Sequence, residues 1–324
     1  MTGSDNLFVH VEENGVSGVG EMAPGSTEGA DTPKKGEKML ADFCASDKSS
    51  NSIQENYDNA IQAGVAPCVV AALDMALWDL RAKQARLPLY KLLGLSKKVV
   101  PTSVTVGINP PEVVRERIPL LLDGTGVKAL KIKLGSPEGL DADQEMFSAV
   151  IEMTKNRSTI IRVDANGGWS VPDAKKMMQW LADRGVEYIE QPLKKGQEDD
   201  LIHLFKNRPL PIYVDESCRV SSDIPNFADR VDGVNLKLMK CGGITEALRI
   251  VSTARAFGLK TMIGCMGESS VSIAAGASIG SLFDYIDLDS HLNLDPDPCN
   301  GAEMTDGRIL PSDNLGHGGS ITNA

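Results

Sequence analysis

Three carboxylates each close a short apolar run, and they are evenly spaced along the chain. Asp164 ends the run IIRVD, Glu190 ends YIE and Asp215 ends IYVD, at intervals of 26 and 25 residues. Such intervals fit one strand–helix unit and would place the three acids side by side at the rim of a parallel barrel. Three buried carboxylates cannot all stay ionised without a cation, and oxygen ligands suit Mg²⁺. The spacing predicts a magnesium site, unless each acid merely caps the next helix.

Lysines are placed to move protons beside that site. In the run ALKIKLG, Lys131 and Lys133 share one face of a strand because side chains alternate, and the apolar residues take the other face. Two neighbouring ammonium groups repel each other, so the pKa of at least one lysine is expected to fall, which suits a base. The alternative is that both lysines simply reach solvent.

A third lysine is expected on the opposite side of the barrel mouth. Lys237 lies on the inward face of NLKLM, four strands after Lys133, so the two should face each other across an eight-stranded ring. We interpret Lys240, which has the opposite parity and precedes two glycines, as a loop residue. A substrate at the metal would then have one amine on each face of a carbon atom.

Two further acids lie in the last apolar run, IDLD. Asp287 and Asp289 share its inward face, and their place in the ring is expected to keep them remote from the metal ligands. Such a pair would bind a cationic group of the substrate, unless it caps a helix or pairs with a nearby lysine. Glu268, just after the seventh strand, is a further substrate-binding candidate at the rim.

The elements that must position these groups follow from the pattern of apolar runs. From Val99 onward, eight runs alternate with helical stretches, which indicates parallel strands joined by helices. Eight runs within about 190 residues favour a closed barrel over an open sheet. The runs span residues 99–108, 127–134, 160–165, 186–191, 211–215, 232–238, 259–265 and 284–289.

The chain divides near residue 98. Before it, residues 6–11 and 16–21 alternate on either side of a turn at Asn14 and Gly15, which is typical of a hairpin, and a helix is expected from Pro67. This first part is predicted to be α+β. The Gly- and Asp-rich segment 290–324 is expected to pack back on it.

The composition excludes several classes of protein. The 324 residues carry 33 basic and 44 acidic side chains, a net charge of −11, whereas a nucleic-acid surface needs clustered positive charge. No apolar run approaches the roughly 20 residues that span a bilayer. Six scattered cysteines without a C-x-x-C pair fit a reducing compartment. We therefore expect a cytoplasmic protein without nucleic-acid or membrane partners, and a homo-oligomer stays open.

The motifs KIKLG, VDANGGW, IEQP, VDES and NLKLMKCGG resemble the enolase superfamily in its muconate-lactonizing branch, and IDLD resembles the dipeptide epimerases of that branch. The resemblance covers nearly the whole chain. It implies an α/β fold: a (β/α)7β modified TIM barrel over residues 99–290 and an α+β capping domain over residues 1–98, completed by 291–324. Because family members usually carry another strand and a substrate loop before NLFVHVEENG, we expect a capping domain that is short at its N-terminus.

The resemblance also implies roles for the candidate residues. Mg²⁺ would bind the three strand-end carboxylates, Lys133 and Lys237 would be the paired acid–base catalysts, and Lys131 would tune Lys133. Asp287 and Asp289 would hold the α-ammonium of a dipeptide. The implied enzyme is an isomerase that inverts the C-terminal residue of a dipeptide by 1,1-proton transfer through an enediolate. Muconate cycloisomerase or o-succinylbenzoate synthase activity, or a metal-binding protein without catalysis, remain alternatives.

Overall fold

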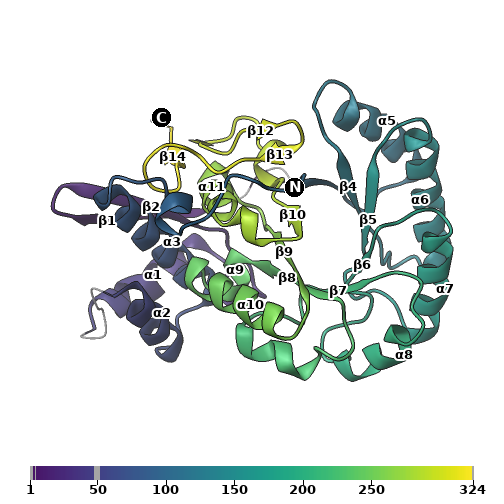
Figure 1. Ribbon diagram of the computed structural model, residues 1–324, viewed down its shortest axis with the longest axis horizontal. Helices are drawn as coiled ribbons and strands as arrows, with labels where there is room; N and C mark the ends of the chain where they lie inside the picture. The colour runs from purple at the N-terminus through teal and green to yellow at the C-terminus, as the bar shows by residue number, and fades with distance from the viewer. Residues whose placement is uncertain (1–2, 4, 47–51, 323–324) are drawn as a thin grey trace.

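The computed structural model describes residues 3, 5–46 and 52–322, and a ring of eight parallel strands forms its larger part (Figure 1). The strands follow one another around the ring in sequence order, and a parallel bridge between Thr102 and Ile286 joins the last to the first. Every strand lies inside one of the eight predicted apolar runs, so the expected barrel is confirmed. The strands are β3 (Ser103–Val106), β4 (Ala129–Lys133), β5 (Ile160–Asp164), β6 (Ile189–Glu190), β7 (Ile212–Val214), β8 (Gly233–Lys237), β9 (Lys260–Gly264) and β10 (Tyr285–Asp287).

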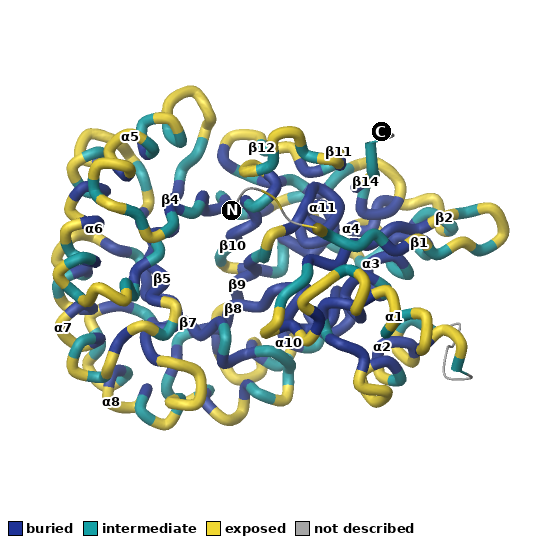
Figure 2. The backbone as a smooth tube through the Cα atoms, turned by 180° about the vertical axis from the view of Figure 1, so that it is seen from behind, coloured by how far each residue is buried: buried dark blue, intermediate teal, exposed yellow. Residues whose placement is uncertain are grey.

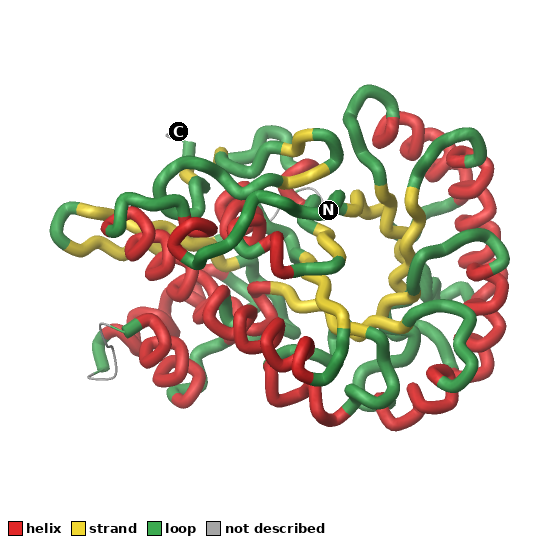
Figure 3. The backbone as a smooth tube through the Cα atoms, in the orientation of Figure 1, coloured by secondary structure: helices red, strands yellow, loops and turns green. Residues whose placement is uncertain are grey.

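Helices connect the strands and cover the outside of the ring (Figure 3). The strands themselves are largely buried, whereas the outer helices expose one side to solvent (Figure 2). Six of the seven crossovers contain an α-helix, and the one between β7 and β8 contains only the 3-10 turn Ser221–Asn226. The helices of this part are α5 (Pro111–Leu122), α6 (Leu140–Thr154), α7 (Val171–Ala182), α8 (Ile202–Phe205), α9 (Leu238–Cys241), α10 (Ile244–Ala256) and α11 (Ser270–Ser278).

A smaller α+β unit lies beside the barrel and contains the predicted hairpin. Its strands pair antiparallel, and β2 packs on α3, which begins at Pro67 as expected. Gly18 and Gly20 permit this packing, because a Cβ at either position would lie about 2 Å from a carbonyl oxygen of α3. The elements are β1 (Leu7–Glu13), β2 (Val16–Met22), α1 (Pro33–Cys44), α2 (Ile53–Gln62), α3 (Pro67–Gln84) and α4 (Leu89–Leu92).

The C-terminal segment returns to this smaller unit. The Leu89 amide donates to the Gly316 carbonyl at 2.6 Å, and a ring nitrogen of His317 lies 2.8 Å from the Val19 carbonyl. The tail thus contacts the smaller unit, while the assignment of residues 291–324 to the capping domain and the limit at residue 98 stay predictions. The short strands of the tail are β11 (Cys299–Asn300), β12 (Met304–Thr305), β13 (Arg308–Ile309) and β14 (Ser320–Ile321).

The remaining 3-10 turns are Glu198–Leu201, Gly280–Leu282 and Ser290–Asn293. Across the described residues, every helix is too short or too polar to cross a lipid bilayer.

Candidate active site

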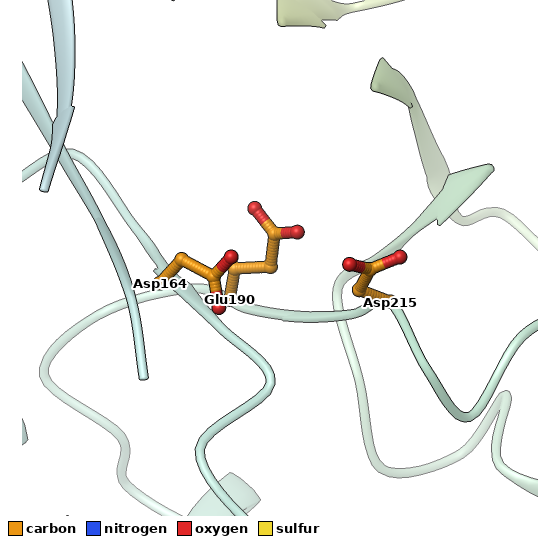
Figure 4. A group of neighbouring side chains, drawn as sticks. All are labelled: Asp164, Glu190 and Asp215. Atoms are coloured by element: carbon orange, nitrogen blue, oxygen red, sulfur yellow. The ribbon is translucent and has the colours of Figure 1, made fainter. Parts of the chain in front are cut away.

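Three acidic side chains converge at the carboxyl ends of adjacent barrel strands (Figure 4). Asp164 ends β5, Glu190 ends β6 in register with it, and Asp215 follows β7. One carboxylate oxygen from each lies within 4.8 Å of the others, and at most 1% of any of these residues is exposed. Three converging hard oxygen donors fit Mg²⁺, which prefers carboxylates and keeps positions for water or substrate oxygens. The predicted clustering of the three acids is therefore found.

Burial and charge act differently on the members of this trio. Burial raises the pKa of Glu190 to about 7, and the carboxylate of Asp164 beside it acts in the same direction. Burial also disfavours the charge of Asp215, but the ammonium groups of Lys237 and Lys240 hold its pKa well below the usual range. Concentrated negative charge of this kind attracts a divalent cation.

The two predicted catalytic lysines lie at opposite ends of the trio. Lys133 Nζ lies 2.8 Å from Asp164 Oδ2, and Lys237 Nζ lies 2.8 Å from Asp215 Oδ2. Both lysines line the same cavity. Each therefore borders the metal site from its own side, which is the arrangement that two-sided proton transfer requires.

The pKa of Lys131 is not lowered, although a lowered pKa was expected for at least one of the two neighbouring lysines. Its ammonium group forms an ion pair with Asp287 and lies 3.3 Å from Glu190 Oε2 and 3.7 Å from Asp164 Oδ2. Although burial opposes the charge, these three carboxylates raise the pKa of Lys131 well above its usual value. Repulsion between Lys131 and Lys133 is thus outweighed at Lys131 by acids from other strands.

The acidic pair at the end of β10 is joined to the carboxylate trio rather than remote from it. Because Lys131 contacts both Asp287 and Glu190, a single ammonium group links the two clusters, and the expected separation is wrong. Asp289 accepts a hydrogen bond from the Thr105 amide at 2.6 Å. Burial and the neighbouring Asp287 raise the pKa of Asp289 to about 6. Both acids line the cavity, and Asp287 Oδ1 has no hydrogen-bond partner.

Glu268 follows β9 but is itself almost fully buried. Its Oε1 accepts a hydrogen bond from the Met266 amide at 2.8 Å, and only 2% of the residue is exposed. Burial raises its pKa to about 8. Glu268 does not belong to the lining of the cavity, and its role in substrate binding stays a prediction.

Several side chains that contact the carboxylate trio lie outside the site residues predicted from the sequence. Lys240 is a buried helical residue of α9, not a loop residue; its Nζ contacts Asp215 and donates to the carbonyls of Cys218 and Asn235. The parity argument failed because the strand ends at Lys237, where a helix begins. A lysine two residues before the pair Gly242-Gly243, directly after a strand, is the sequence signal for this position.

Gln191 and Asn235 also form hydrogen bonds with residues of the trio. The Gln191 backbone is left-handed, with φ of 38°, and its Oε1 accepts from the Asp215 amide at 2.8 Å. Asn235 donates to Glu190 Oε1 at 2.7 Å. A polar residue directly after Glu190, where a helix or loop must begin, was the available signal for Gln191.

The cavity that Lys133 and Lys237 border is lined by both charged and apolar side chains. Its volume is about 870 Å³, which is the size of a small-molecule site. The three lysines and the acidic pair line the barrel side. The outer wall carries apolar side chains from β1, from the loop after β9 and from the segment after β10: Phe8, Met266, Leu294, Pro296 and Pro298.

Comparison with known proteins agrees with this geometry. Residues 114–324 match the family described as Enolase C-terminal domain-like, and residues 2–94 match the Mandelate racemase / muconate lactonizing enzyme, N-terminal domain. A Hydrophobic dipeptide epimerase of Roseobacter litoralis is 68% identical over 99% of this chain and 93% of its own length. Another protein of that name, from a Flavobacteria bacterium, is 62% identical over 97% of this chain and 90% of its own length.

A solved structure shows the same fold with ligands. The Dipeptide Epimerase from Enterococcus faecalis, complexed with Mg and the dipeptide L-Leu-L-Tyr, has a TM-score of 0.88 and 32% identity, covering 98% of this chain and 92% of that one. The chain therefore belongs to the mandelate racemase/muconate lactonizing enzyme family of the enolase superfamily.

Proposed function

We propose that this protein is a Mg²⁺-dependent isomerase that inverts the configuration at the Cα of the C-terminal residue of a dipeptide. The observation that carries this proposal is the placement of Lys133 and Lys237 at opposite ends of one carboxylate trio. A carbon atom bound between them meets an amine on each face. That arrangement suits a 1,1-proton transfer, in which one group removes the proton and the other returns one to the opposite face.

In this proposal the acids bind the metal ion and the two lysines transfer the protons. Asp164, Glu190 and Asp215 would hold Mg²⁺, which, when bound, supplies positive charge that stabilises the electrons left on the substrate carboxylate as the α-proton leaves. One lysine, in its neutral form, takes the proton from Cα. The other, in its ammonium form, donates a proton to the opposite face. The lysines exchange roles when the opposite epimer is bound.

The acidic pair would fix the other end of the dipeptide. Asp287 and Asp289 line the cavity at the end of β10. Asp287 shares its charge with Lys131, but its Oδ1 has no partner, so this oxygen and the carboxylate of Asp289 can accept from a bound cation. An α-ammonium group satisfies this charge, whereas substrates of the cycloisomerase or succinylbenzoate type have no ammonium to offer. We therefore place the dipeptide's N-terminal ammonium at this pair.

The outer wall suggests the substrate class. Phe8, Met266 and Leu294 line the same cavity as the acidic pair, and burial of apolar side chains against such residues is favourable. Relatives at 68% and 62% identity bear the name Hydrophobic dipeptide epimerase. We propose hydrophobic dipeptides as substrates.

The direct test is incubation of the protein with Mg²⁺ and a library of L,L-dipeptides in D₂O, followed by mass spectrometry. The proposal expects one deuterium at Cα of the C-terminal residue, greatest for hydrophobic dipeptides and lost on chelation. Uptake confined to the N-terminal residue, or turnover of muconate-type or succinylbenzoate-type compounds in place of dipeptides, would contradict it.

Asp289→Asn is expected to raise KM for dipeptides about 30-fold while changing kcat less, because it removes one of the charges that face the ammonium group. Steady-state epimerisation of a dipeptide and of its N-acetyl derivative measures this effect. The variant should lose most of the preference for the free amine over the acetylated one. Asp284→Asn, at the other end of the barrel where Asp284 accepts from the Thr261 amide, is the matched control. An unchanged preference in Asp289→Asn would remove Asp289 from the ammonium site.

We also propose a cytoplasmic location and small-molecule substrates without nucleic-acid partners. The six cysteines are free thiols in the structure, as expected in a reducing compartment, and the net charge of −11 disfavours a polyanionic partner.

A further inference from the structure

Glu21 is a buried carboxylate that reaches from the smaller unit into the barrel. It lies in β2, has no exposed surface, and lines the cavity. In Figure 1, β2 and α11 lie close together where the two parts of the chain meet, and the residue contacts between them agree. The proposed reaction assigns no role to this acid. A buried carboxylate is nevertheless costly unless hydrogen bonds compensate it.

The hydrogen bonds of Glu21 are concentrated at the start of α11. Its Oε1 accepts from the Ser269 amide at 2.9 Å, and its Oε2 accepts from the Ser269 hydroxyl at 2.7 Å and from the Ser272 amide at 3.1 Å. Ser269 is the N-cap of α11, and the first turn of that helix has no acidic residue of its own. Glu21 thus supplies, from a distant strand, the negative charge that stabilises a helix N-terminus.

The segment held in this way forms one wall of the substrate cavity. Residues 265–269 connect β9 to α11, and four of the five line the cavity. Asn6, just before the hairpin, also contacts residues 265–269. Its Nδ2 donates to Glu21 Oε1 at 2.7 Å and to the Gly267 carbonyl at 2.9 Å. At the other end of the segment, Cys265 Sγ lies 3.6 Å from Asp289 Oδ1.

We propose that Glu21 is a positioning residue for substrate binding, which fixes the wall 265–269 beside Asp289 from the smaller unit. It acts through that wall and not on the reacting atoms, because the lysines and the carboxylate trio lie on other strands. Loss of the anchor should therefore weaken dipeptide binding more than it slows proton transfer. Only this kinetic consequence rests on the proposed function; the anchoring itself does not.

The test variant is Glu21→Gln, which keeps the shape of the side chain but removes its charge and one acceptor. Hydrogen–deuterium exchange of the folded protein should become about tenfold faster in residues 265–272, since two amides there bond to Glu21. KM for a hydrophobic dipeptide should rise about tenfold, with kcat within about twofold of wild type. Ser269→Ala, which removes the hydroxyl donor and leaves Glu21 intact, should give smaller changes in the same direction, and it serves as the test if Glu21→Gln does not fold.

Asp79→Asn is the matched control. Asp79 is another buried carboxylate of the smaller unit, and it accepts from the amides of Val19 and His317, outside the cavity. This control should lower the thermal midpoint but leave both KM and exchange in 265–272 unchanged. Exchange in that segment at the wild-type rate in Glu21→Gln, or faster exchange with unchanged KM, would overturn the inference. A wild-type protein that turns over no dipeptide would count against the proposed function, and the exchange comparison would still decide the anchoring.

Discussion

Lys133→Ala and Lys237→Ala are each expected to abolish epimerisation, with kcat reduced by at least about 10³-fold, whereas both variants should still bind Mg²⁺. The reason is geometric: each lysine borders one end of the carboxylate trio, so neither can reach the face served by the other. General acid–base groups in such positions contribute about 10²- to 10⁴-fold to the rate. The measurement is inversion of a hydrophobic dipeptide followed by circular dichroism, with Mg²⁺ binding followed by calorimetry.

The same geometry makes a sharper prediction about isotope exchange. With one lysine removed, the remaining lysine can still take the α-proton from the epimer that faces it and return deuterium to the same face. Each variant should therefore exchange only one epimer in D₂O, without inversion, and the two variants should select opposite epimers. Lys97→Ala, which removes an exposed lysine paired with Asp313, is the control and should behave as wild type. Inversion by either active-site variant at near the wild-type rate would refute the two-lysine mechanism.

The register of the acid trio could be predicted from the sequence because parallel strands end at the same rim of a barrel. Asp164 and Glu190 are paired across neighbouring strands as that argument requires. Alternation along a strand likewise placed Lys131 and Lys133 on the inward face, where both line the cavity. These inferences need only the local periodicity of each strand and the order of strands around the ring.

Contacts across the barrel interior could not be predicted in the same way. Periodicity shows that Lys131 and Asp287 both point inward, but not that long side chains from β4 and β10 meet and form an ion pair. That contact depends on side-chain length and barrel tilt, which no single strand reveals. For the same reason the sequence wrongly predicts that Asp287 and Asp289 are remote from the trio, because Lys131 connects Asp287 to Glu190.

The ends of strands are a second source of error. Strand parity does not apply to Lys240, because α9 begins at Leu238 and each further residue then turns about 100° instead of 180°. Its ammonium group consequently points back to Asp215. The role of Gln191 is hidden from strand periodicity for a related reason, since its left-handed backbone redirects the chain directly after Glu190.

Glu190→Gln is expected to weaken Mg²⁺ binding at least about 100-fold and to abolish epimerisation. Glu190 is the central member of the trio. The substitution replaces its charged carboxylate by an amide with one neutral oxygen, and Mg²⁺ binds charged carboxylate oxygens more strongly. Glutamine matches the shape of the side chain, and Lys131 keeps its partner Asp287, so the fold should persist. Calorimetric titration of the variant with Mg²⁺ measures the loss.

Thermal unfolding gives an independent measure of the same prediction. A ligand that binds only the folded state stabilises it by about 2.7 kcal/mol at 100 times its Kd, so Mg²⁺ should raise the Tm of the wild type and chelation should reverse the rise. The Tm of Glu190→Gln should not respond to Mg²⁺ at the same concentration. Glu187→Gln is the matched control, since Glu187 lies just before β6 and pairs with Arg162 rather than with the trio; its Tm should respond as the wild type does. If Glu190→Gln were stabilised by Mg²⁺ as strongly as wild type, the metal would have to bind elsewhere, and the assignment of the trio would fail.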